Sequence, residues 1–143
     1  MDIEQARDLA IELMREHGLE GWTLMFDRSK RRAGSCNLGY QRITLSRPIT
    51  ELNDADHVRD TILHEIAHAK VGPTTEAAHG PKWRAMAASI GAAPKARGAG
   101  KVPPGKWQAR GDCPGKTHHM HRKPKNRYAC RRCKSELHYA MVS

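Results

Sequence analysis

The stretch His64-Glu65-Ile66-Ala67-His68 decides how this chain is interpreted. It lies in an apolar-periodic run from Val58 to Val71 that predicts a helix, and residues four apart on a helix share one face. His64 and His68 can therefore offer two imidazoles to one metal ion, while Glu65 can reach a water molecule bound to that metal. This HExxH spacing is typical of two zinc ligands and a general base.

The residues around the motif favour a metal site over a pair of core histidines satisfied by hydrogen bonds. Ile62, Leu63, Ile66 and Ala67 make the other faces of the helix apolar, which predicts a buried helix. Unpaired buried polar groups cost roughly 1–3 kcal/mol each, so two histidines and a glutamate in such a helix require a function.

A catalytic zinc ion commonly has three protein ligands and one open position. His79 is the best candidate for the third ligand, because it comes just before a helix expected to begin at Pro81, where a ligand is held rigidly. Glu76 remains an alternative, although its loop offers no obvious anchor. His57 and His17 are interpreted as a surface residue in a first helical turn and a helix C-terminal residue.

Such a site predicts peptide or related hydrolysis without a serine or cysteine nucleophile. Zinc lowers the pKa of its bound water to near 7, and Glu65 can accept the proton and later deliver it to a leaving amine. Cys36 is expected to be a small buried residue, because it has no CxxC partner.

Hydrophobic periodicity predicts an α+β fold for residues 1–94. We expect helices from Asp2 to about His17, from a cap at Asn53 or Asp54 to Gly72, and from Pro81 to Ile90. Strands are expected around residues 22–26, 35–38 and 42–46, in a small antiparallel sheet that Pro48 ends.

The charge of the chain is concentrated in its last third. Residues 95–143 contain 13 Lys and Arg and two acidic residues, a net charge of +11, whereas residues 1–94 have a net charge of −1. We therefore predict a linker rich in Gly, Pro and basic residues at 95–110 and a basic module at 111–143. The basic residues expected to bind DNA, with single strands favoured and no dependence on base sequence, are Arg110, Arg122, Lys123, Lys125, Arg127, Arg131, Arg132 and Lys134.

The sequence contains no apolar run of 18 residues and no basic-then-apolar leader, so no membrane partner is expected. We predict a monomer in the cytoplasm, either of a bacterium, including its nucleoid, or of a phage-infected cell. The four cysteines are then expected to be reduced or metal-bound.

Several motifs in order along the chain resemble the SprT-like zinc metallopeptidases, and the small size resembles bacterial or phage members. These motifs are Ala33-Gly34-Ser35-Cys36, Ile43-Thr44-Leu45-Ser46, the segment Arg59–Ala69 with its HExxHA, Val71-Gly72-Pro73 and His79-Gly80-Pro81-Lys82-Trp83. The pairing of HExxHA with a later HGxxW is highly specific. The resemblance implies a zincin-like minimal metallopeptidase domain in which His64, His68 and His79 bind zinc and Glu65 is catalytic.

The resemblance also implies a partner. The eukaryotic member Spartan is a DNA-dependent protease that degrades proteins crosslinked to DNA, which suggests DNA–protein crosslink repair. Members of the family often end in a zinc ribbon, and Cys130-Arg131-Arg132-Cys133 supplies half of one. Cys113 begins the other half, but Lys116 stands where a second cysteine belongs, so His118, His119 or His121 would complete it, with His118 preferred.

We accordingly expect two zinc ions, one catalytic and one structural, in a zinc-dependent endopeptidase that acts on DNA-associated proteins. The alternative is a non-enzymatic DNA-binding or regulatory module stabilised by zinc. The intact Glu65 favours the enzyme, because a purely structural zinc site does not need a general base.

Overall fold

The computed structural model describes residues 1–95, 98–105, 107–110, 118–120, 123, 127–129 and 134–141. The chain forms two compact units, Met1–Pro103 and Pro104–Ser143. The first unit ends within residues 95–110, which the sequence predicts to be a linker. None of the helices in the described ranges combines the length and apolar character needed to cross a membrane.

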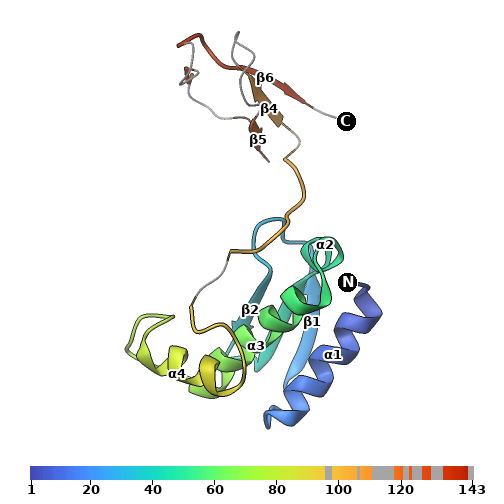
Figure 1. Ribbon diagram of the computed structural model, residues 1–143, viewed down its shortest axis with the longest axis vertical. Helices are drawn as coiled ribbons and strands as arrows, with labels where there is room; N and C mark the ends of the chain where they lie inside the picture. Colours follow the sequence, from blue (N-terminus) through green and yellow to red (C-terminus); the bar gives the residue numbers. More distant parts are fainter. Residues whose placement is uncertain are drawn as a thin grey trace. The chain divides into compact units, whose positions relative to one another are not determined.

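Helix α1 spans Ile3–Glu16 and is capped as its sequence predicts. The side chain of Asp2 accepts a hydrogen bond from the backbone N–H of Gln5. Ala6, Ala10 and Leu13 are buried and lie on one face of the helix, which packs against α3. Figure 1 shows α1 beside the sheet of the first unit.

A sheet of three strands forms the second layer of this unit. Its strands are β1 (Thr23–Asp27), β2 (Gly34–Asn37) and β3 (Arg42–Ser46), in the order β1-β3-β2. β2 and β3 pair in antiparallel fashion, but β1 and β3 are parallel, so the predicted antiparallel sheet is wrong for β1. Strands β1 and β3 run in the same direction, and β2 runs in the opposite one. Because β3 lies between the other two strands, where its Ile43 and Leu45 are buried, β1 pairs with β3 in parallel rather than with β2.

Helix α2 (Arg47–Leu52) follows β3 directly and was not predicted. The hydroxyl of Ser46 accepts a hydrogen bond from the N–H of Ile49, and Pro48 lies in the first turn, where its missing N–H needs no partner. Pro48 therefore ends the strand, as expected, by helping to begin a helix.

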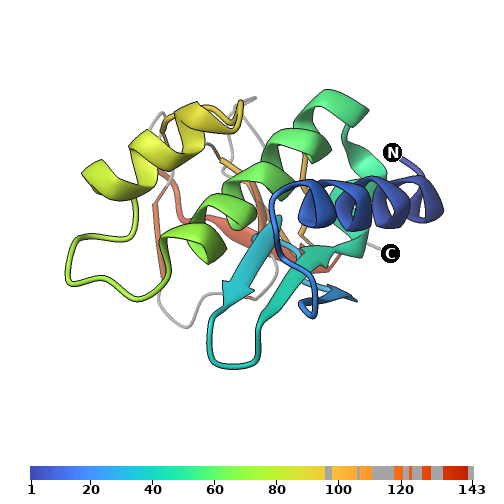
Figure 2. The ribbon, with the colours of Figure 1, turned by 90° about the horizontal axis from the view of Figure 1, so that it is seen from below.

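Helix α3 (Ala55–Val71) is the centre of the unit. Asp54 caps its first turn and Gly72, at φ 71°, ends it. Helix α4 (Pro81–Ser89) packs against α3 through buried Trp83 and Ala87. Figure 2 shows α3 between α1 and α4, with α1 and α3 on the same side of the sheet.

Residues 98–103, here called the arm, return to the surface of the first unit. The side-chain amide of Asn53 donates to the carbonyl of Lys101 (2.9 Å) and accepts from its N–H (3.0 Å). Gly100 has φ +82°, and a Cβ there would lie 2.5 Å from both Asn53 Oδ1 and His57 Nε2. The arm is therefore in close contact with the start of α3.

The second unit contains a separate antiparallel sheet. Its strands β4 (Trp107–Arg110), β5 (His118–Met120) and β6 (His138–Met141) are arranged in the order β5-β4-β6. Outside the strands, Ala129 and Glu136 form an isolated bridge.

Candidate metal centre

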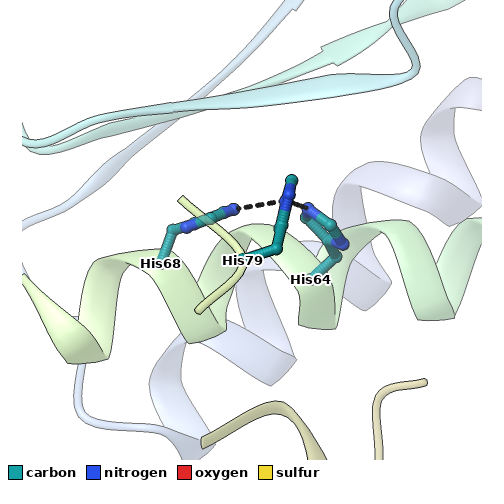
Figure 3. A group of neighbouring side chains, drawn as sticks. All are labelled: His64, His68 and His79. Carbon is teal, nitrogen blue, oxygen red and sulfur yellow. Dashed lines mark hydrogen bonds between the residues drawn. The ribbon is translucent and has the colours of Figure 1, made fainter. Parts of the chain in front are cut away.

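Three histidines converge on one point of the first unit. His64 and His68 lie one turn apart on α3, and His79 lies in the loop just before α4. Figure 3 shows the three rings pointing toward one another. Their ligand atoms all lie within 4.8 Å of one another, so the predicted third histidine joins the two of the HExxH motif.

The distances from His79 to the other two ligand nitrogens are close to those of a tetrahedral metal site. His79 Nε2 is 3.0 Å from His64 Nε2 and 3.2 Å from His68 Nε2. Zn–N bonds of 2.0–2.1 Å in tetrahedral geometry place two ligand nitrogens about 3.3 Å apart. Three nitrogen donors with one position left open are the donor set of a catalytic zinc site.

The electrostatic setting keeps the imidazoles ready for ligation. Burial, followed by the proximity of His68 and His79, lowers the pKa of His64 to about 4, although Asp60 opposes this. Burial and then His79 also lower the pKa of His68. Both rings are therefore neutral near pH 7, and a neutral imidazole is the form that binds a metal ion.

Glu65 lies beside this cluster in a largely dehydrated position. Its side chain is on the buried part of α3, with 7% of the residue exposed. Burial raises the pKa of its carboxyl group to about 7, and the positive charge of Arg32 partly opposes the shift. A carboxyl group with a pKa near neutral is suited to accept and return a proton at physiological pH.

The histidines and Glu65 line an open pocket of about 830 Å³. One wall is strand β2, which contributes Gly34, Ser35 and Cys36. The sequence did not reveal two other parts of the wall, which are Arg31 and Arg32 in the loop before β2 and Gly98 and Ala99 of the arm. Only the three-dimensional fold brings these segments to the histidines.

The rival ligands have other roles. A carboxylate oxygen of Glu76 accepts a hydrogen bond from the backbone N–H of Lys82 (3.0 Å) and so caps α4. His17 is the C-cap of α1, as expected, and the backbone N–H of His57 donates to the Asp54 cap in the first turn of α3. Cys36 is half-buried, and its pKa is raised to about 12 by burial and by Glu65, so the thiol stays protonated.

Comparison with protein families matches residues 7–105 to the SprT-like family. The chain belongs to the SprT-like family. Among solved structures, this SprT-like chain resembles the zymogen of the metallopeptidase jannalysin from Methanocaldococcus jannaschii, with a TM-score of 0.50 and 20% identity over 59% of this chain and 79% of that chain. A search of curated proteins found no match. The family, the fold and the histidine cluster are together those of a metallopeptidase.

The predicted ribbon ligands mostly lie outside the described residues. Cys113, Cys130 and Cys133 are among the residues left undescribed, and of His118 only the backbone, in β5, is described. The structural zinc stays a prediction.

The predicted DNA-binding residues are also only partly described. Arg122, Lys125, Arg131 and Arg132 lie outside the described ranges, and Arg110 is described only as part of the backbone of β4. Lys123 and Lys134 are exposed, and Arg127 Nε pairs with a Glu136 carboxylate oxygen at 2.9 Å. A DNA-binding role for these residues stays a prediction.

Proposed function

We propose that this SprT-like protein is a zinc-dependent endopeptidase that acts on DNA-associated proteins. The observation that carries the proposal is the convergence of three imidazoles beside a buried glutamate in an open pocket. His64, His68 and His79 would hold the zinc ion, which supplies Lewis acidity toward water and the scissile carbonyl when bound.

Glu65 is the residue that would move the proton. Its carboxylate lines the pocket, where it can accept a proton from the attacking water and return it to the leaving nitrogen. Its low exposure keeps bulk water away from the carboxylate, which favours transfer within the site.

The pocket wall supports a peptide as the substrate. In the sheet order β1-β3-β2, strand β2 pairs with β3 on one side, and no described strand pairs with its other side. An extended peptide can add to such an edge through backbone hydrogen bonds, which hold it without requiring a particular sequence. Since β2 lines the pocket, this would place a peptide bond near the histidines.

The basic second unit supports DNA-associated proteins as targets. Residues 104–143 contain ten Lys and Arg and two acidic residues, and this net charge of +8 suits a polyanion, so binding DNA would raise the concentration of nearby proteins around the pocket.

Hydrolysis of an unfolded protein substrate by the zinc-loaded chain tests the proposal. We expect Glu65→Gln to retain the zinc of the pocket and lose cleavage by at least about 100-fold, as general acid–base groups contribute 10²–10⁴. Glu51→Gln makes the same chemical change on the exposed surface of α2 and should cleave normally. Cleavage by the Glu65→Gln variant at the wild-type rate would refute the role of Glu65. Zinc binding without any hydrolysis by the wild-type protein would favour the non-enzymatic alternative.

A further inference from the structure

We propose that Trp83 is a positioning residue that holds all three histidine rings in the arrangement a metal ion requires. The inference rests on the proposed zinc site and assigns a role there to the tryptophan of the HGxxW motif, which is not itself a ligand. Trp83 lies in the first turn of α4, four residues after His79.

The indole ring contacts each of the three imidazoles. Its centroid is 4.6 Å from that of His64, 5.4 Å from that of His68 and 4.7 Å from that of His79. The ring of His68 is nearly stacked on it, with an interplanar angle of 29°, and that of His79 meets it edge-on at 78°. One rigid aromatic surface therefore restricts the rotation of three ligands that come from two separate segments.

The indole is itself fixed in place. Trp83 is only 2% exposed, and its Nε1–H donates to the backbone carbonyl of His64 at 3.2 Å. In an α-helix that carbonyl also accepts the N–H of the residue four positions on, which here is His68. The hydrogen bond thus ties the indole to the one turn of α3 that carries both ligands, and it sets the distance between α3 and the segment that carries His79.

The consequence concerns metal affinity more than folding. Without the indole the three rings can rotate, and binding a metal must then restrict them. Groups that orient metal ligands typically contribute 10- to 100-fold to affinity. A Trp that only filled the core would instead affect the stability of the metal-free protein and leave the affinity of the folded protein unchanged.

The test compares Trp83→Leu and Trp83→Phe with Ala87→Gly in the full-length chain. Ala87 is one turn further along α4, on the same face, and is also fully buried, so its substitution loosens the same helix contact without removing the indole. Zinc affinity is measured by competition with a chromophoric chelator. The visible spectrum of the cobalt-loaded protein reports the ligand geometry. Thermal unfolding of the metal-free protein reports stability. The variant His64→Ala supplies the baseline, because any metal bound by the second unit remains in it.

We expect Trp83→Leu to weaken zinc binding at the pocket by 10-fold or more and to change the cobalt spectrum. Trp83→Phe should lie between it and the wild type, because a ring remains while the Nε1 donor is lost. Ala87→Gly should lower the unfolding temperature and bind zinc within about twofold of the wild type, since its packing defect does not reach the rings.

Two results would overturn the role of Trp83 without affecting the proposed function. One is wild-type zinc affinity in both Trp83 variants, and the other is an equal loss of affinity in Ala87→Gly. Should Trp83→Leu fail to fold, the comparison of Trp83→Phe with Ala87→Gly decides the matter. Identical zinc binding by wild type and His64→Ala would instead overturn the proposed function, and the positioning role with it.

Discussion

Glu65 holds its carboxyl group where charge is disfavoured. The residue is 7% exposed, and burial raises its pKa from 4.5 to about 7. In the metal-free protein the folded state therefore keeps a proton between pH 4.5 and 7 that the unfolded state has released. By linkage, the proton adds to the free energy of unfolding. This contribution is fully present below pH 4.5 and disappears as the pH rises through 7.

Glu65→Gln should remove this pH dependence. With chelator present, we expect the free energy of unfolding of the wild type, minus that of the variant, to rise by up to about 3 kcal/mol from pH 7 to pH 4.5. His64, with its lowered pKa, contributes the opposite trend, but it is present in both proteins. Urea unfolding at four or five pH values measures the difference. Parallel stability curves would show that Glu65 titrates normally.

At the scale of elements, the loop before α4 is the segment that delivers the third ligand. Gly80, the N-cap of α4, has no side chain to accept a hydrogen bond, so Glu76 supplies the acceptor for the N–H of Lys82. The same loop carries His79 between these two residues. The contact that caps α4 therefore also fixes the loop that places His79.

Glu76→Ala should destabilise the chain by about 1 kcal/mol and weaken zinc binding at the pocket, because the loop that holds His79 loses its anchor. Glu76→Gln keeps an oxygen acceptor and should lose less of both. Urea unfolding and chelator competition measure the two effects. Equal losses in both variants would assign the effect to the negative charge near the helix N-terminus rather than to the hydrogen bond.

The elements also show which parts of the fold are determined by residues close together in the sequence. The caps at Asp2 and Asp54 and the stop at Gly72 allowed α1 and α3 to be predicted, because each acts within one helical turn. Helix α2 was missed although Ser46 and Pro48 form a local start signal. The parallel pairing of β1 with β3 could not be deduced, since strand direction depends on the path of the chain between strands.

The metal site also has parts that the local sequence predicts and parts that only tertiary packing brings together. The spacing of His64, Glu65 and His68 is local to one helix and could be identified directly. His79 needed the further expectation of a helix starting at Pro81. The arm in the pocket wall and the contacts of Trp83 with three rings come from tertiary packing, and no spacing in the sequence indicates them.

At the scale of the whole molecule, the arm ties the end of the first unit to its centre. A side chain at position 100 would need the left-handed conformation, which costs a non-glycine residue roughly 1–2 kcal/mol. It would also meet Asn53 Oδ1, which cannot move away freely because it accepts the N–H of Lys101.

Gly100→Ala should therefore reduce the free energy of unfolding by at least about 1 kcal/mol more than Gly91→Ala does. Gly91 is the matched control, because its φ is +87° and a Cβ there meets nothing within 4 Å. Urea unfolding measures stability, and limited proteolysis reports whether the arm is released. A smaller effect at position 100 than at position 91 would contradict the close packing of the arm.

The basic second unit predicts a second property of the whole molecule. We expect DNA binding that is insensitive to base sequence and weakens by about 100-fold between 50 and 200 mM salt, if about five phosphates are contacted on a single strand. Truncation after Pro103, the end of the first unit, should abolish it. Fluorescence anisotropy of the full-length and truncated chains measures both effects. Salt-independent binding, or equal binding by the truncated chain, would exclude an electrostatic role for residues 104–143.

The strand order β1-β3-β2 has a consequence for the time course of folding. In the sheet of the first unit, β3 is the last strand to be synthesised and lies in the middle. Strand β1 therefore has no hydrogen-bonded neighbour until residue 46 has left the ribosome. Strands β2 and β3 are separated by only residues 38–41, and such hairpins form within microseconds. A nascent chain should therefore form this hairpin first. Until β1 pairs with β3, Leu24 and Phe26 of β1 stay exposed and can associate with other chains.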